Sequence, residues 1–174
     1  NHPWRAALGS IGGGNHFAEL QQVDSVTDAA LFAQSGLDEQ RLLLLAHSGS
    51  RGQGQQILRR HVDAFSHAGL VEGSDAARHY LAEHDDALNF ARINRALIAQ
   101  RILDHLNADG EALLDVAHNF VEACTVGGEA GWLHRKGATP DGQGLVVIPG
   151  SRGDHSWLVM PKVSEVSLYS LAHG

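Results

Sequence analysis

The sequence predicts an α+β fold, in which short strands that build mixed sheets flank a helical block. Three observations support this class. Short apolar runs bounded by glycine-rich turns occur before residue 50, apolar residues recur at three- and four-residue steps over 74–106, and short apolar runs return beyond residue 110. Because the strands form groups before and after the helices, we expect α+β architecture rather than a regular alternation of strand and helix.

The first part of the chain is expected to begin with a strand at 17–23, where apolar and polar residues loosely alternate after a glycine-rich entry. A short helix follows at 28–34. The apolar run at 41–46 is bounded by polar turns, which predicts a fully buried strand. Residues 53–67 then form a helix with one apolar face.

The strongest helical signal covers 74–106, and residues 107–110 supply its stop. Six apolar residues would stack on one stripe of this amphipathic helix. They are Phe90, Ile93, Leu97, Ile98, Ile102 and Leu106. Beyond the stop we expect further strands at 112–117, 120–126, 144–148 and 156–160.

Composition narrows the function classes. A chain of 174 residues fits one domain. The net charge of −7 argues against binding nucleic acid through a broad positive surface, so contact with a polyanion must be local. A single cysteine excludes an internal disulfide framework, and no apolar run reaches the roughly 18 residues of a membrane helix. We therefore expect no membrane association and, by default, a cytoplasmic protein.

Three histidines share one setting, at a predicted strand end or in the loop that follows it. They are His16, His47 and His118. Neutral imidazole is a common ligand for Zn, Mn, Fe, Ni and Cu, and three from distant parts of a chain can form one face of a coordination shell. Any one of the 12 histidines, taken alone, is more often a surface or core residue. The common setting predicts a metal site at the strand ends.

Other polar segments allow more than one interpretation. The turn at 149–153 offers backbone N–H groups, Ser151 and Arg152 to a phosphate, or is a simple turn. The donor-rich stretch at 134–139 receives a phosphate or is a polar turn. Arg92 and Arg95, three residues apart on the long helix, support the site or a nucleic-acid backbone, or are solvated surface charges. Cys124 lies in an apolar stretch and is expected to be a small core residue.

The motifs occur in one order that resembles the RtcB RNA ligases, and the resemblance spans nearly the whole chain. The matching segments are Gly12-Gly13-Gly14-Asn15-His16-Phe17 with Glu19, His47-Ser48-Gly49-Ser50-Arg51-Gly52, His118-Asn119, His134-Arg135-Lys136-Gly137-Ala138-Thr139, Pro149-Gly150-Ser151 with Gly153 and Ser156, and His173-Gly174. On this resemblance, residues 1–174 are an interior portion of a single RtcB-like catalytic domain, with upstream and downstream segments missing.

The resemblance implies an RNA ligase that depends on GTP and Mn²⁺ and joins a 3′-phosphate or 2′,3′-cyclic phosphate end to a 5′-hydroxyl end. His173 would be the nucleophile that forms a histidine–GMP intermediate. The metal ligands would be His16, His47 and His118, with two Mn²⁺ ions per site in the complete protein. The residues implied at the guanylate are Asn15, His16, Phe17, Glu19, His118, Asn119, Pro149, Gly150, Ser151, Arg152, Ser156, His173 and Gly174.

The chain also departs from the family pattern. Arg152 stands where many relatives carry Met, and the stretch at 162–170 is short, which suggests a divergent branch devoted to RNA repair rather than tRNA splicing. The family's further metal ligands, an Asp and a Cys, lie upstream of the glycine-rich entry and outside this sequence. Broken or spliced RNA is the implied partner, with GTP, and a helper protein for turnover is compatible with the resemblance.

Two competing functions remain open. A histidine-rich metallohydrolase acting on phosphate esters would use the same ligands to activate water and would need neither GTP nor His173. A catalytically inactive relative would keep the fold and bind RNA without bound metal. Labelling with GTP, a His173→Ala variant and metal analysis separate the three functions.

Overall fold

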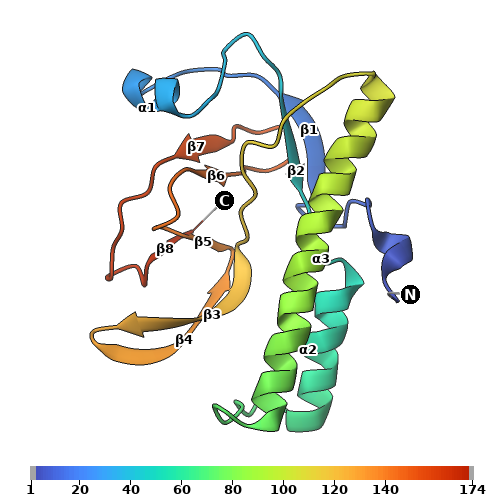
Figure 1. Cartoon of the computed structure of the whole chain (residues 1–174), viewed down its shortest axis with the longest axis vertical. Helices are drawn as coiled ribbons and strands as arrows, with labels where there is room; N and C mark the ends of the chain where they lie inside the picture. Colours follow the sequence, from blue (N-terminus) through green and yellow to red (C-terminus); the bar gives the residue numbers. More distant parts are fainter. Residues whose placement is uncertain (1–2, 173–174) are drawn as a thin grey trace.

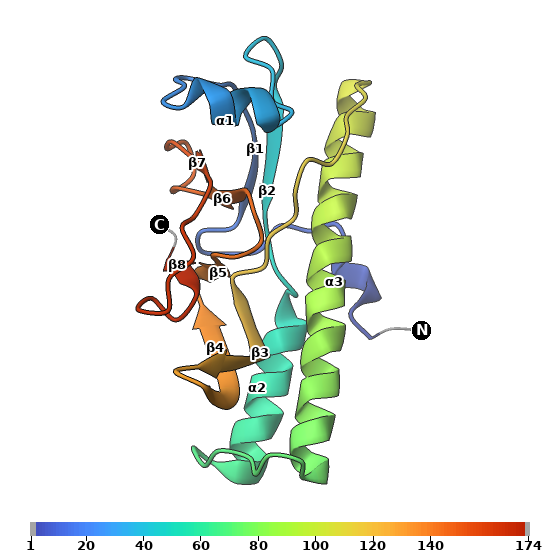
Figure 2. The same ribbon diagram turned by 60° about the vertical axis from the view of Figure 1, so that its left-hand side comes forward.

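The computed structural model of the chain describes residues 3–172. Helices α2 and α3 lie side by side along one side of the molecule, and the small sheets lie along the other (Figures 1 and 2). The elements, in order, are η1 (Arg5–Ala7), β1 (Phe17–Gln21), α1 (Ala29–Gln34), β2 (Leu43–His47), α2 (Gly52–Phe65), α3 (Asp75–Leu106), β3 (Asn119–Val126), β4 (Glu129–Lys136), β5 (Ala138–Pro140), β6 (Val146–Ile148), β7 (Trp157–Val159) and β8 (Ser170–Ala172).

The α+β class is confirmed, and the described strands form four separate two-stranded antiparallel sheets. The pairs are β1–β2, β3–β4, β5–β8 and β6–β7. In the β1–β2 pair, Phe17 lies opposite His47. The β3–β4 pair is a hairpin whose turn consists of Gly127 and Gly128, both with positive φ, as a two-residue turn of the primed type requires.

Helix α3 begins and ends where the sequence predicts. The hydroxyl of Ser74 accepts a hydrogen bond from the backbone N–H of Ala77, and Asn107 ends the helix in the left-handed conformation. The expected apolar stripe is partly wrong, because Ile93 and Leu106 are 40% and 49% exposed. The buried stripe instead passes through a polar residue at its centre. Its members are Ala87, Phe90, Ala91, Asn94 and Ile98.

Two strand predictions are corrected. The run at 41–46 is not fully buried: β2 is half-buried throughout, and Leu42 is 64% exposed. Among the described strands β2 pairs only with β1, so one of its edges carries no partner strand. Residues 111–118 form no strand, and Leu113 is 47% exposed. The predicted strands at 17–23, 144–148 and 156–160 are present but shorter.

The core of the described residues is small. Its buried apolar members are Phe17, Ile57, Ala87, Phe90, Ala91, Ile98 and Val146. The accessible surface is 11482 Å², whereas a self-contained globular protein of this mass exposes about 8200 Å². Much apolar side-chain surface is therefore left in contact with solvent. Within residues 3–172, none of the helices combines the length and apolar character needed to cross a membrane.

Candidate functional site

The three predicted histidines all lie at strand ends. His16 directly precedes β1, His47 is the last residue of β2, and His118 directly precedes β3. Because Phe17 pairs with His47, the β1–β2 register brings His16 beside His47. The packing of α3 against both β2 and β3 brings His118 to the same place.

The three imidazole rings form a continuous group. The Nε2 atoms of His47 and His118 are 3.2 Å apart, and their ring centroids are 5.3 Å apart. The rings of His16 and His47 meet edge to face, with centroids 5.8 Å apart. Residues separated by more than 70 positions in the sequence thus lie close together.

The arrangement fits a shared metal ion for two of the three rings. Two imidazole nitrogens that bind one ion at about 2.0–2.1 Å lie roughly 3 Å apart, which matches the separation between His47 and His118. His16 does not complete a trio: in residues 3–172, no group of three or more His, Cys, Asp or Glu side chains has metal-binding geometry. The Nδ1 atom of His16 is instead buried without a hydrogen-bond partner, next to Gly12.

The surroundings of His16 favour its neutral form. Burial lowers the pKa of this imidazole below 6.5, and the positive charge of Arg51 lowers the pKa further, while a backbone contact to Gly13 acts in the opposite direction. Arg51 is held in place by a hydrogen bond from its Nε to the hydroxyl of Ser10, at 3.1 Å. A neutral ring is the form that binds a metal ion.

The turn predicted to hold the guanylate lies against β1 and the residues before it. The amide of Asn15 donates to the carbonyl oxygen of Gly150 at 3.2 Å, and the carboxylate of Glu19 accepts from the N–H of Gly153 at 3.1 Å. The guanidinium of Arg152 donates to the carbonyl oxygen of His16 at 3.2 Å. Two sequence motifs more than 130 positions apart are therefore joined directly.

Gln21 is part of this connection, although sequence reasoning missed it. Its amide donates to Glu19 at 2.8 Å and to the hydroxyl of Ser156 at 3.0 Å. The only sequence signal was its place in β1, two residues beyond Glu19 and therefore on the same face of the strand. Pro149 is buried under the turn, and Ser151 is exposed.

One open cleft connects the two predicted groups. Its lining includes His16, His47, His118, Asn119, Pro149 and Ser156. The amide oxygen of Asn119 accepts a hydrogen bond from the N–H of Gly137 at 2.8 Å, which fixes the corner between β4 and β5. Phe17 is 2% exposed, and its ring meets the ring of His47 edge to face, so this buried side chain packs against the histidine group.

The donor-rich stretch at 134–139 is neither a phosphate-binding loop nor a polar turn. Its residues belong to β4 and β5, joined at Gly137. Arg135 is buried and donates to Glu122, to the hydroxyl of Ser170 and to the carbonyl oxygen of Tyr169. These partners occupy the guanidinium, so Arg135 joins three segments of the fold.

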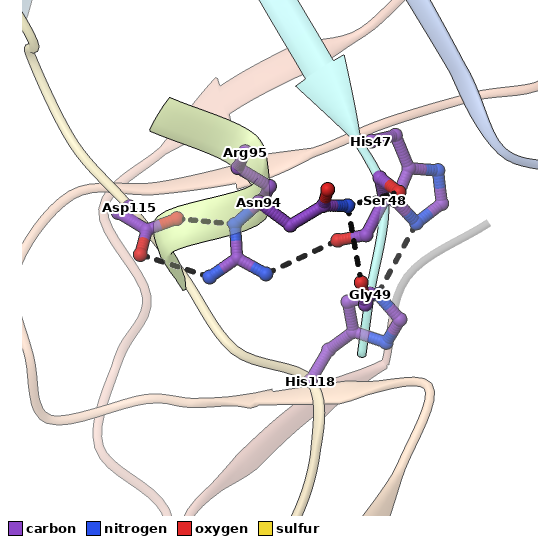
Figure 3. A network of polar contacts seen from close by, with 7 residues as sticks. All are labelled: His47, Ser48, Gly49, Asn94, Arg95, Asp115 and His118. Carbon is purple, nitrogen blue, oxygen red and sulfur yellow. Dashed lines mark hydrogen bonds and ion pairs between the residues drawn. The ribbon is translucent and has the colours of Figure 1, made fainter. Parts of the chain in front are cut away.

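Helix α3 contributes Arg95, for which the sequence left a supporting role in the site open, and Asn94, which the sequence did not single out. Figure 3 shows Asn94 and Arg95 joined to Ser48 and Gly49, the two residues after His47, and Arg95 paired with Asp115. The signal for Asn94 was a polar residue in a helical stripe that is otherwise apolar. Arg92, which the sequence grouped with Arg95, is exposed and donates to Asn89 on its own helix. His173 and Gly174 lie outside the described residues.

Comparison with known proteins identifies the family. The family model described as tRNA-splicing ligase RtcB matches residues 1–174. The chain is 68% identical, over 99% of its length, to the RNA-splicing ligase RtcB2 of Escherichia coli, of which the match covers 46%. It is 34% identical, over 96% of its length, to the tRNA-splicing ligase RtcB of Nanoarchaeum equitans, of which the match covers 44%.

A third relative is the RNA-splicing ligase RtcB of Mycobacterium tuberculosis, which is 32% identical over 96% of this chain and 47% of the relative. The chain thus spans about half the length of the curated relatives that it matches. The match of the family model extends over every segment that forms the histidine group and the turn beside it. The chain belongs to the RtcB family of tRNA-splicing ligases.

Proposed function

We propose that the protein containing this chain is an RNA ligase that joins a 3′-phosphate or 2′,3′-cyclic phosphate end to a 5′-hydroxyl end, with GTP as co-substrate and Mn²⁺ as cofactor. The observation that carries the proposal is one cleft whose lining includes the histidine group and the two ends of the turn at 149–156, Pro149 and Ser156. Relatives named as RNA- or tRNA-splicing ligases support the reaction class.

His47 and His118 would hold the metal ion. His16 would become the third ligand on a movement of its ring toward them, because no three side chains in residues 3–172 have metal-binding geometry. The 3.2 Å separation of the two Nε2 atoms supports a shared ion, and the lowered pKa of His16 keeps its ring available as a neutral donor. Imidazole alone suits several transition metals. Mn²⁺ in particular, with two ions in the complete protein, rests on the family. Mn²⁺ bound there would neutralise phosphate charge and orient the reacting groups.

The guanylate would bind where the turn at 149–156 meets β1. Asn15, Glu19 and Arg152 form the contacts between these segments, and Ser156 is tied to them through Gln21. Phe17 and Pro149 are buried and would support the pocket, whereas Ser151 and Asn119 are exposed and present polar groups. Glu19 would accept hydrogen bonds from the N–H edge of guanine.

His173 would act as the nucleophile. A neutral ring nitrogen attacks the α-phosphate of GTP, a phosphorus–nitrogen bond forms, and pyrophosphate leaves. The guanylate then passes to the RNA 3′-phosphate, and the 5′-hydroxyl attacks this activated phosphate and displaces GMP. A covalent intermediate divides one difficult substitution into easier steps.

RNA would contact the protein locally, because a net charge of −7 provides no broad positive surface. We also propose that residues 1–174 are an interior portion of a single catalytic domain. The excess of exposed surface over that of a self-contained protein of this mass supports this proposal. RNA repair in a divergent branch of the family, action in the cytoplasm and a helper protein for turnover are parts of the same proposal.

The test uses the full-length protein with labelled GTP, Mn²⁺ and two RNA fragments, one ending in a 3′-phosphate and one beginning with a 5′-hydroxyl. We expect acid-labile labelling of the protein and a joined RNA product, both lost in His173→Ala and retained in His67→Ala, which changes an exposed histidine in the loop between α2 and α3. Labelling that persists in His173→Ala would place the nucleophile elsewhere. Phosphate-ester hydrolysis without GTP would favour the metallohydrolase, and absence of bound metal would favour the inactive RNA-binding relative.

A further inference from the structure

The centre of α3 is tied to the loops of the site by one buried amide. Asn94 is 0% exposed. Its side-chain oxygen accepts from the N–H groups of Gly9 and Ser10, at 2.7 and 3.3 Å. Its nitrogen donates to the carbonyl oxygens of Ser10 and Gly49 and to the hydroxyl of Ser48, at 3.1, 3.3 and 3.1 Å. Every polar atom of the amide is used, so the 48–49 loop has a fixed position on the helix.

The next residue, Arg95, extends this attachment in two directions. Its Nη1 donates to the carbonyl oxygen of Ser48 at 3.1 Å. Ser48 is the residue directly after His47 in the chain. Its Nε and Nη2 bind the two carboxylate oxygens of Asp115, at 2.5 and 2.8 Å. This paired contact constrains both the distance and the orientation of the two groups. One guanidinium thus connects the segment after His47 to the segment before His118.

The connection matters because residues 111–118 form no helix or strand. A segment without a backbone ladder takes its position from the contacts made by its side chains and ends. Asp115 supplies one such contact, and the carbonyl oxygen of His118, which accepts from the N–H of Ala138 at 3.0 Å, supplies another. Figure 3 shows the rings of His47 and His118 tilted against each other and joined through one nitrogen of each, beside this network.

We infer that Arg95 and Asp115 are positioning residues that set the separation between the rings of His47 and His118. Arg95 acts through the backbone of Ser48, whose hydroxyl Asn94 binds. Asp115 acts through the two residues that separate it from His118. The inference rests on the proposed function only for the role of the ring pair, which is to bind the metal ion.

The test compares Arg95→Lys and Asp115→Asn with the parent full-length protein. Lysine keeps the charge but loses the paired contact, and asparagine keeps the shape but loses the charge. In the metal-free protein with labelled histidine, we expect the nuclear Overhauser effect between the rings of His47 and His118 to weaken strongly. With Mn²⁺ alone as the probe, we expect binding to weaken by about 10–100-fold in either variant, and the double variant to be little worse than the single ones.

Arg101→Lys is the matched control. Arg101 lies on the same helix and donates to the carbonyl oxygens of Leu8 and Gly9, at 3.1 and 2.8 Å, so it also attaches α3 to a loop. This variant is expected to lower the melting temperature without changing the ring contact or the Mn²⁺ affinity. Arg95→Lys could instead keep the parent's ring contact and Mn²⁺ affinity and lose only melting temperature. That result would show that the ion pair is merely structural.

The two proposals fail in different ways. If the parent protein binds no Mn²⁺ but the ring contact is lost in both variants, the positioning role holds and the proposed metal site does not. If the parent binds Mn²⁺ and both variants bind it with the same affinity and keep the ring contact, the metal site holds and the positioning role does not.

Discussion

The Nε2 atom of His47 lies 3.2 Å from the Nε2 atom of His118, across 71 positions of sequence. One ring ends β2, and the other stands directly before β3, so two separate sheets each contribute one nitrogen. A pair that meets in this way, on segments that share no backbone ladder, is held by tertiary contacts rather than by secondary structure.

Replacing His118 with alanine removes one nitrogen of this pair. Changing a residue that only hydrogen-bonds a metal ligand lowers metal affinity by up to about 100-fold. Since His118 would itself be a ligand, we expect its loss to lower the Mn²⁺ affinity by at least that factor. Titration with Mn²⁺, followed by the paramagnetic signal of the free ion, measures the change. His67→Ala should bind like the parent, and an unchanged affinity in His118→Ala would rule this ring out as a ligand.

Gly12→Ala would displace His16. A Cβ atom at position 12 would lie 2.0 Å from the Nδ1 of His16 and 2.3 Å from Nη1 of Arg51, so both side chains would have to move. We expect a loss of about 1–3 kcal/mol in the free energy of unfolding and weaker Mn²⁺ binding. Gly13→Ala is the matched control, because nothing lies within 4 Å of its added Cβ. If Gly12→Ala and Gly13→Ala have the same stability and the same Mn²⁺ affinity, a Cβ atom at position 12 does not displace His16.

Acid should destabilise the metal-free protein partly through His16. Its pKa in the folded chain is below 6.5 because of burial and Arg51. The unfolded chain therefore takes up this proton first, and the stability present above pH 6.5 is lost as the pH falls toward the folded-state pKa. Urea unfolding at about pH 7.5 and about pH 5.5 should show a smaller loss in His16→Gln than in the parent. Equal losses would mean that His16 titrates alike in both states.

Gly150→Ala should disturb the turn beside the proposed guanylate pocket. Its Cβ would meet the carbonyl oxygen of His155 at 2.4 Å, and a backbone atom cannot move aside without shifting the turn. We expect a loss of about 1–3 kcal/mol in stability and a higher KM for GTP, with kcat less affected. Gly142→Ala, whose Cβ would make an ordinary 3.9 Å contact with Val163, should behave like the parent. If Gly150→Ala has the same KM for GTP as the parent protein, this turn does not contribute to GTP binding.

Arg135→Ala should reduce stability rather than phosphate binding. The Arg135 side chain is 3% exposed and lies 5.1 Å from the centre of the Phe120 ring, besides its contact with Glu122. Removing one partner of a buried ion pair costs about 3–5 kcal/mol, and we expect the lower end because Glu122 is 38% exposed. The exposed neighbour Lys136 should change stability by less than about 0.5 kcal/mol when replaced by alanine. Urea unfolding of both variants makes the comparison.

The sequence predicts best where a pattern is long or a motif is local. The repeat of apolar residues and the stop at 107–110 predict α3 almost to the residue. Apolar runs that break into glycine-rich turns place His16 and His47 at strand ends. The Gly127-Gly128 pair is a hairpin signal from which β4 could also have been predicted. Strands β5 and β8 span three residues each, which is too short for a period of two to be visible.

The contacts that complete the site could not be predicted, because they join residues far apart in sequence through polar side chains. The sequence left Arg95 open between support of the site, contact with a nucleic-acid backbone and a solvated charge, and it did not single out Asp115. Tertiary packing places the two within hydrogen-bond distance. The run at 112–117 has the apolar content of a strand but no partner strand within the described residues. Pairing with a neighbouring strand, rather than propensity, decides whether such a segment becomes a strand.

The division of the described strands into separate ribbons has a consequence for folding dynamics. Since β1–β2 and β3–β4 share no ladder, each can exchange its amide hydrogens as an independent cooperative unit, and the opening of residues 111–118 needs neither to unravel. We therefore expect a minor state in which the β3–β4 hairpin and the helices persist while the rings of His47 and His118 are separated. A metal ion bound by both rings would cross-link the two segments and disfavour this state. Slower amide hydrogen exchange around His118 after addition of the ion would therefore report that the metal site has formed.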